Sequence, residues 1–187
     1  MAITYKQCPR CHSKKVATIL YGEPTYEAYQ QAEEGKVVLG GCCVLFDGPE
    51  YSCNDCGYRW NKREAIEAAY ARIKGINFSI GGFFEGEFFV EVNFETRDMK
   101  WGHRNVGGEK VNVKQLRKTS VDRIIAEIQA VNLLNWKSRY SSEFPIMDGT
   151  HWSLELLRDG RSIVKSGDNG FPDEWDPFYE IMERYAR

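Results

Sequence analysis

Two Cys-x-x-Cys pairs constrain this chain more than any other feature of its sequence. The first is Cys8-Pro9-Arg10-Cys11, and the second is Cys53-Asn54-Asp55-Cys56, which Gly57 follows directly. Two thiolates on one tight turn can ligate a single ion, and two such turns complete a tetrahedral shell of four sulfurs about 2.3 Å from the metal. Gly57 suits the left-handed backbone that such a turn commonly needs. The pattern predicts one structural Zn²⁺ bound by Cys8, Cys11, Cys53 and Cys56.

Redox chemistry and simple packing are the alternatives for these cysteines. A redox Cys-x-x-Cys pair needs a helix N-terminus after a buried strand, because the helix end lowers the thiol pKa. Cys8 lies too near the start of the sequence for a preceding buried strand, and residues 13–21 after Cys11 read as a strand. These features favour zinc over both alternatives.

Three further residues compete as ligands. Cys42 and Cys43 are adjacent, and neighbouring residues on a strand point to opposite faces, so at most one could face the site. We expect both to be small buried thiols within a strand over residues 36–46. His12 follows Cys11, but four sulfurs already close the shell, so we expect His12 to lie beside a ligand or to be exposed.

The insert between the two pairs is longer than in compact zinc ribbons. Forty-one residues separate Cys11 from Cys53, whereas about 15–20 are typical. Residues 23–35 predict a helix with Pro24 in its first turn and Gly35 as its stop. An insert with its own helix and strand can return the chain to the metal site.

Composition predicts an ordinary globular protein of one domain or two small ones. The chain has 187 residues, 42% of them hydrophobic, and a formal net charge of −2. It has no apolar run of the roughly 20 residues that span a bilayer, and no basic start followed by an apolar run that would indicate a secretory signal. We therefore expect a cytoplasmic protein with reduced thiols and no membrane partner.

The remainder of the chain predicts an α+β fold. A zinc ribbon over residues 1–61 precedes a helical connector over 62–75 that Gly75 stops, and an antiparallel sheet domain over 76–187. Within that domain the periodicity predicts the order hairpin, helix, hairpin, helix. The elements are a hairpin over 76–98, a helix over 120–136 capped by Thr119 or Ser120, a hairpin over 151–166 with Asp159-Gly160 at its turn, and a helix over 171–187 with Pro172 in its first turn. Two helices on one sheet face would bury all the apolar stripes. These stripes are Val121, Ile124, Ile125, Ile128 and Val131 of the first helix, Trp175, Phe178, Tyr179 and Met182 of the second, and Phe88, Val90, Val92 and Phe94 of the first hairpin.

Residues 5–60 resemble small bacterial zinc-ribbon proteins. The resemblance rests on a CPxC knuckle, a Gly-Gly-Cys strand and a CxxCG knuckle followed by an aromatic residue, which are here Cys8–Cys11, Gly40–Cys42 and Cys53–Gly57 with Tyr58. The second half resembles another bacterial α+β domain, through Asp148-Gly149, Trp152, Asp168–Pro172 and Trp175–Phe178. The first resemblance implies a zinc site, and neither implies an activity.

The sequence offers weak catalytic candidates. Asp148, His151 and Asp168 lie around the second hairpin and could converge, but a histidine near a turn more often forms ordinary hydrogen bonds than acts as a base. His103 stands apart from any motif. The aromatic residues Trp136, Tyr140, Trp152 and Trp175 could line a pocket, although such residues usually pack in a core. We therefore assign no catalytic residue, and an enzyme with a pocket in the C-terminal domain is the least favoured function.

The favoured function is a non-enzymatic interaction module with another protein as its partner. A nucleic-acid-binding regulator is the alternative, with candidate contacts at six basic residues around the knuckles: Arg10, Lys14, Lys15, Arg59, Lys62 and Arg63. Four thiolates and one Zn²⁺ leave the metal site itself at a charge of −2, so binding to nucleic acid should be weak.

Overall fold

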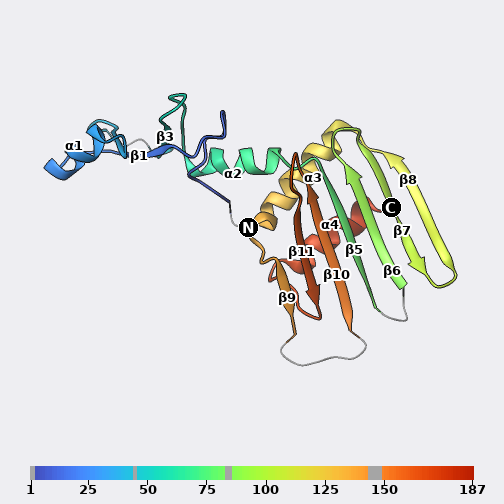
Figure 1. Ribbon diagram of the computed structural model, residues 1–187. Coiled ribbons are helices and arrows are strands. Elements are labelled where there is room, and N and C mark those ends of the chain that lie inside the picture. The colour runs from blue at the N-terminus through green and yellow to red at the C-terminus, as the bar shows by residue number, and fades with distance from the viewer. Residues whose placement is uncertain (1–2, 44–45, 83–85, 143–148) are drawn as a thin grey trace. The chain divides into compact units, whose positions relative to one another are not determined.

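The computed structural model describes residues 3–43, 46–82, 86–142 and 149–187 (Figure 1). The chain is an α+β protein that divides into two compact units, residues 3–69 and residues 70–187. The division falls within helix α2 (Lys62–Ala71), which occupies most of the predicted connector. Each unit contains its own mostly antiparallel sheet, and the described residues include four α-helices.

Residues 3–69 form a four-stranded sheet in the order β2-β1-β3-β4. Its elements are β1 (Val16–Leu20), α1 (Tyr26–Glu33), β2 (Val37–Leu39), β3 (Tyr51–Cys53) and β4 (Arg59–Trp60). Strand β1 pairs in parallel with β2 and antiparallel with β3. Thr25 caps α1, since its hydroxyl accepts the Ala28 N–H at 3.3 Å, and Gly35 follows the helix with φ +70°.

Residues 70–187 form a seven-stranded sheet in the order β8-β7-β6-β5-β10-β11-β9 (Figure 1). All neighbouring strands are antiparallel except β9 and β11. The strands are β5 (Gly75–Gly82), β6 (Gly86–Asn93), β7 (Asp98–Asn105), β8 (Gly108–Gln115), β9 (Arg139–Ser141), β10 (Thr150–Leu157) and β11 (Ile163–Asp168).

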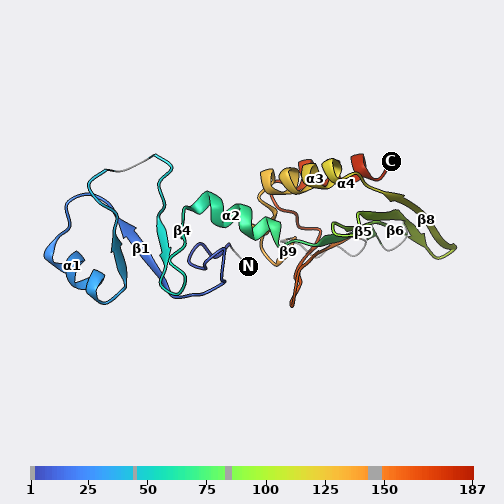
Figure 2. The same cartoon turned by 90° about the horizontal axis from the view of Figure 1, so that it is seen from above.

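Helices α3 (Lys118–Ala130) and α4 (Trp175–Tyr185) pack on one face of this sheet (Figure 2). A short 3-10 helix, η1 (Leu133–Asn135), follows α3. The core between helices and sheet is aromatic: Phe78 of β5 lies 5.2 Å from Phe178 of α4, and Trp152 of β10 lies 4.8 Å from Trp175, measured between ring centroids. The predicted arrangement of two helices on one sheet face is confirmed.

The sequence predicted several elements of this unit correctly. Of the predicted stripes, Val121, Ile124 and Ile128 are buried on α3, and Trp175, Phe178 and Met182 are buried on α4. Ile125 and Tyr179 are half-buried. Strands β10 and β11 form the predicted hairpin, with Gly160 at φ +80° in its turn. Phe88, Val90 and Val92 lie on the helix-covered face of β6, because they pair with Ile80, Phe78 and Ile76 of β5.

Other predictions were wrong. The order is not hairpin, helix, hairpin, helix, because β7 and β8 extend the first hairpin to a four-stranded meander before α3. Helix α3 begins earlier than predicted, with Arg117 at its N-cap instead of Thr119 or Ser120, and it ends at Ala130 because Asn132 adopts φ +53°. Helix α2 ends at Ala71, and Gly75, its predicted stop, is instead the first residue of β5.

Both helices predicted to begin at a proline begin after it. Pro24 precedes the Thr25 cap of α1, and Pro172 lies three residues before the first residue of α4, Trp175. The proline of the first turn of α4 is Pro177, which suits this position because the first turn has no intrahelical acceptor for its N–H groups.

The predicted buried strand over residues 36–46 forms only in part, as β2 (Val37–Leu39), and residues 44–45 of it lie outside the described residues. Strand β2 ends at Leu39, and Cys42 and Cys43 are exposed. Gly40 has no room for a side chain, since a Cβ there would lie 2.6 Å from the Tyr21 ring, and Gly41 has φ +87°. The two glycines therefore turn the chain away from the sheet.

Candidate functional site

Each Cys-x-x-Cys pair forms a tight turn closed by the same backbone hydrogen bond. The N–H of His12 donates to the carbonyl of Cys8 at 3.0 Å, and the N–H of Gly57 donates to the carbonyl of Cys53 at 2.9 Å. Both residues have left-handed backbones, with φ of +62° at His12 and +71° at Gly57. The sequence identified this role for Gly57 but missed it for His12, which is the structurally equivalent residue and is exposed.

The four predicted cysteines lie together. Their sulfur atoms all lie within 4.8 Å of one another, with 3.6 Å between Cys8 and Cys56 and 3.5 Å between Cys11 and Cys53. Four sulfurs about 2.3 Å from a central ion form a tetrahedron with edges of about 3.8 Å. The cluster is therefore compact enough to bind one metal ion, and its donors suit an ion that prefers sulfur.

Polar contacts outside the cluster hold the two turns in register. The Ser13 hydroxyl donates to the Asp55 carboxylate at 2.6 Å, and Lys15 forms an ion pair with the same carboxylate at 3.2 Å. The Asn54 N–H donates to the Lys15 carbonyl at 2.9 Å, where β1 meets β3. The two cysteine turns are thus linked by residues adjacent to the four cysteines, as well as by the contacts between the sulfurs.

A small aromatic core supports one side of the cluster. Cys8 and Cys53 are buried with Tyr51, Trp60 and Ala65, against which Tyr5, Val16 and Tyr58 pack. The indole N–H of Trp60 donates to the Tyr5 carbonyl at 3.0 Å and fixes the segment that enters the first turn. Cys11 and Cys56 are exposed on the other side.

The thiols of the cluster differ in acidity. Burial opposes ionisation of Cys53, but the backbone N–H groups of Cys56 and Asp55 stabilise its thiolate and lower its pKa to about 7. The Ser13 N–H favours the Cys11 thiolate, yet proton sharing with the other sulfurs raises the Cys11 pKa to about 12. Backbone donors therefore stabilise negative charge on the sulfurs, as a thiolate metal site requires.

Substitutions at the two left-handed positions should differ in their effect on the free energy of unfolding. Gly57→Ala places a Cβ in open space at φ +71°, so its cost is conformational and should be about 1–2 kcal/mol of unfolding free energy. His12→Gly removes the same strain from the first turn and should leave stability unchanged or raise it by up to about 1 kcal/mol. Thermal melts of both metal-loaded variants test this pair. Equal losses would show that the first turn depends on the imidazole and not on the backbone.

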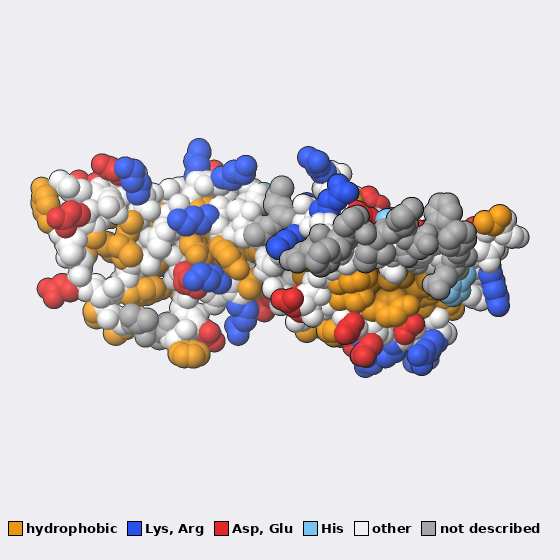
Figure 3. Space-filling view, turned by 90° about the horizontal axis from the view of Figure 1, so that it is seen from below, with side chains coloured by type: hydrophobic (Ala, Val, Ile, Leu, Met, Phe, Trp, Pro, Cys, Tyr) orange, Lys and Arg blue, Asp and Glu red, His pale blue; other side chains and the backbone are white. Residues whose placement is uncertain are grey.

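The six basic residues proposed as nucleic-acid contacts do not form a uniform basic surface. Lys15 pairs with Asp55, Lys62 with Glu50, and Arg63 with Asp47 and Glu67, at 3.2–3.8 Å. Arg10, Lys14 and Arg59 are exposed. On the face shown in Figure 3, basic side chains of residues 3–69 are interspersed with acidic ones. Carboxylates thus already neutralise three of the six side chains.

Two of the catalytic candidates, His151 and Asp168, contact each other. His151 Nδ1 lies 2.5 Å from Asp168 Oδ1, and Arg139 lies 3.2 Å from Oδ2 of the same carboxylate. The hydrogen bond to His151, followed by that to Arg139, lowers the Asp168 pKa. Asp148 lies outside the described residues. His103 is exposed, with its ring 5.2 Å from Phe88. Of the three candidates, His151 and Asp168 are in contact, but the Asp168 carboxylate also forms an ion pair with Arg139.

Three of the four candidate pocket aromatics are buried, as predicted, whereas Tyr140 is half-buried and lines a surface pocket together with Trp136. The rings of Trp136, Tyr140 and Trp175 lie 4.8–6.2 Å from that of Trp152. The Trp152 indole donates to the Gly170 carbonyl at 2.8 Å, and the Trp136 indole donates to the Val131 carbonyl at 3.1 Å. Buried donors with backbone acceptors are typical of a core.

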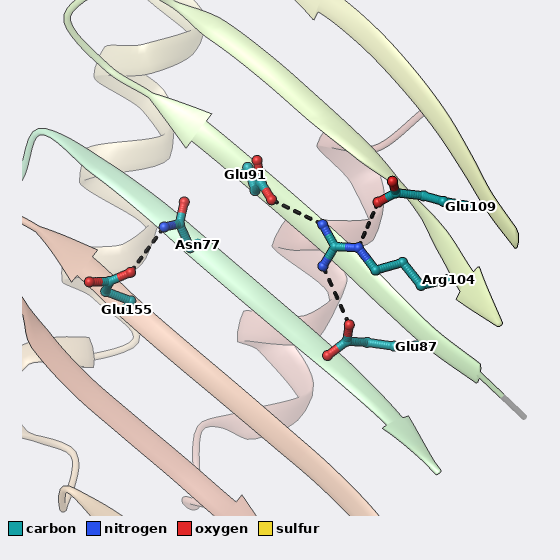
Figure 4. Close-up of polar contacts among 6 residues, drawn as sticks. All are labelled: Asn77, Glu87, Glu91, Arg104, Glu109 and Glu155. Atoms are coloured by element: carbon teal, nitrogen blue, oxygen red, sulfur yellow. Dashed lines mark hydrogen bonds and ion pairs between the residues drawn. The ribbon is translucent and has the colours of Figure 1, made fainter. Parts of the chain in front are cut away.

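A charged network that the sequence did not indicate lies on the sheet face opposite the helices (Figure 4). Arg104 of β7 contacts Glu109 at 2.6 Å, Glu91 at 3.3 Å and Glu87 at 3.4 Å. Its guanidinium covers the buried ring of Phe89 at 3.9 Å. Cross-strand pairing of Glu87, Arg104 and Glu109 produces the network. Arg104 thus has its partners within the chain and shields an apolar ring.

No helix among the described residues is long and apolar enough to cross a membrane. A scan of the chain against models of known protein families and a search of curated proteins both find no match.

Proposed function

We propose that this chain is a zinc-ribbon protein in which one Zn²⁺, bound by Cys8, Cys11, Cys53 and Cys56, has a structural role. The observation that carries the proposal is the close approach of four sulfurs from two turns. Four thiolates fill the tetrahedral shell that Zn²⁺ prefers, and they leave no position for a substrate or water. The ion therefore stabilises residues 3–69. The resemblance of residues 5–60 to bacterial zinc-ribbon proteins supports the same assignment.

The whole protein acts, in this proposal, as a non-enzymatic interaction module whose partner is another protein. The closed metal shell supports a role other than catalysis for the first unit. In the second unit the histidine and aromatic candidates have partners within the fold, namely Asp168 for His151 and the neighbouring rings for Trp152. Binding at the surface then remains the function that best fits both units.

Two measurements test the proposal. Elemental analysis of the purified full-length chain should give one zinc per molecule. A pull-down from the native host, with nucleic acid assayed in the same eluate, should recover a protein partner that persists after nuclease treatment. Zinc well below one per chain would contradict the metal assignment. A partner that disappears with nuclease treatment would instead favour the nucleic-acid-binding regulator.

Direct binding to nucleic acid should be weak and sensitive to salt. Lys–phosphate and Arg–phosphate contacts lose affinity steeply as salt rises, and Lys15, Lys62 and Arg63 already have carboxylate partners. We expect a salt titration with DNA and RNA to show no binding at about 150 mM salt.

Two triple variants distinguish nucleic-acid contacts made beside the second turn from general electrostatic binding. Arg59→Glu/Lys62→Glu/Arg63→Glu reverses three charges beside the second turn. Lys100→Glu/Lys118→Glu/Lys137→Glu makes the same charge change at exposed positions of the second unit. Tight binding at 150 mM salt (roughly physiological) that is lost only in the first variant would overturn the preference for a protein partner.

A further inference from the structure

The strongest unassigned feature is the pair of adjacent thiols at Cys42 and Cys43. The chain reaches them through two glycines that are fixed against the end of β1. The Gly40 N–H donates to the Leu20 carbonyl at 2.7 Å, and the Gly22 N–H donates to the Gly41 carbonyl at 2.9 Å. A Cβ at Gly40 would collide with Tyr21 and Ile19. The residue that precedes the thiols is therefore anchored by its backbone.

The two thiols lie on the same side of the chain. Their sulfur atoms are 3.9 Å apart, and both residues are exposed. In an extended strand, adjacent side chains would point to opposite faces. The left-handed Gly41, at φ +87°, ends the extended backbone of β2 before the first thiol. Two nucleophilic sulfurs are thus presented together to solvent.

The spacing of the sulfurs matches two adjacent positions around one metal ion. With metal–sulfur bonds of about 2.3 Å, a separation of 3.9 Å corresponds to a sulfur–metal–sulfur angle of about 116°. This angle lies between those of tetrahedral and trigonal coordination. In the described residues, the one group of three or more metal-ligating side chains is the four-cysteine cluster, which includes neither Cys42 nor Cys43. The pair would therefore leave one or two coordination positions open.

We infer that Cys42 and Cys43 form a second, open site for a thiophilic centre, distinct from the closed four-cysteine cluster. Soft ions such as Cu⁺ bind thiolates strongly and accept low coordination numbers, whereas structural Zn²⁺ demands a complete shell of four. Each thiol releases its proton as its bond to the metal forms, and no electron is transferred. An external thiol or another small ligand completes the coordination of the bound ion.

A trivalent arsenical also binds two thiolates, and its retention reports directly whether the two thiols act together. Phenylarsine oxide reacts with two neighbouring thiols, forming two arsenic–sulfur bonds, and its oxygen leaves as water with both thiol protons. Arsenic stays trivalent throughout. A stable adduct therefore requires both sulfurs, and a single thiol does not retain it.

The test uses the full zinc-loaded chain under reducing, anaerobic conditions. Wild type, Cys42→Ser, Cys43→Ser and the double variant are each exposed to one equivalent of phenylarsine oxide and, separately, to Cu⁺ against a chromophoric competitor. We expect wild type to retain one arsenical by mass spectrometry and to bind one Cu⁺. Each serine variant should lose both, and zinc content should be the same in all four proteins.

The outcomes separate this inference from the zinc proposal. Equal retention of both probes by wild type and the double variant would overturn the second site. Copper uptake accompanied by release of an equivalent of zinc would also overturn it, because the ion would then occupy the four-cysteine cluster. Retention of the arsenical without Cu⁺ binding would reduce the pair to an accessible dithiol and overturn its assignment as a metal site. Zinc content alone reports on the first proposal.

Discussion

Cys53→Ser is expected to lose the metal ion and to unfold residues 3–69, while residues 70–187 stay folded. Structural zinc contributes on the order of 10–16 kcal/mol of apparent binding free energy, which is as large as the whole stability of a typical domain, about 5–15 kcal/mol. The apolar core around the cluster consists of few side chains, so little else can hold this unit together. Elemental analysis measures the metal, and peptide-resolved hydrogen exchange reports the unfolding of each unit.

Cys43→Ser is the matched control for this variant. It makes the same chemical change in the same unit, but Cys43 is exposed and lies outside the four-sulfur cluster. Its zinc content and hydrogen exchange should equal those of wild type. Normal zinc in Cys53→Ser, or loss of zinc in Cys43→Ser, would show that the ligands have been misassigned.

The parts of the structure that the sequence predicted have strong local signals. A Cys-x-x-Cys pair encloses its own turn, so the candidate ligands could be chosen from spacing alone, and the structure brings all four together. Helices α3 and α4 have apolar stripes of helical period. The turn between β10 and β11 has Gly160 at a positive φ, which Asp159-Gly160 indicates directly.

Strands β7 and β8 escaped prediction because their pattern does not alternate cleanly. On β7, Met99 and Gly102 are buried while Lys100 and His103 are exposed. On β8 nearly every side chain is exposed, and the alternation of Val111 and Val113 is too short to indicate a strand. Both strands form because β6 presents an open edge to β7, and β7 in turn to β8. Their stability therefore comes from pairing with the preceding strand, which lies close in the sequence, and not from a pattern within the strands themselves.

Strand β11 reverses the usual burial pattern. Val164 is 55% exposed, whereas its neighbour Lys165 is fully buried. Lys165 pairs with Leu154 of β10, on the face that the helices cover. Its ammonium donates to the carbonyls of Leu134, at 3.3 Å, and of Trp136. These carbonyls lie at η1, which the sequence did not reveal, so no local pattern could indicate a buried lysine here.

Lys165→Ala is expected to destabilise residues 70–187 by about 2–4 kcal/mol. The substitution leaves a cavity and removes the donor from two buried carbonyls. Lys165→Met is the matched control, since it fills most of the volume but donates no hydrogen bond. Denaturant unfolding followed by tryptophan fluorescence measures the loss, because four of the five tryptophans lie in this unit. A loss equal to that of Lys165→Met would show that only the lost hydrogen bonds matter, and not the volume.

Wild type and Lys165→Met should also differ in how their stability depends on pH, and the sign of that difference can be predicted. Burial lowers the Lys165 pKa from 10.5 to about 8, so between these values the unfolded chain binds a proton that the folded chain has released. The folded state therefore gains stability as pH rises through this window, by up to about 1.4 kcal/mol per pH unit. A neutral amine still donates to both carbonyls, so their hydrogen bonds persist. The stability of wild type relative to Lys165→Met should rise from pH 8 to pH 9.5, a range over which titrations common to both proteins cancel. A constant difference across that range would show that the lysine keeps an ordinary pKa and lies in contact with water.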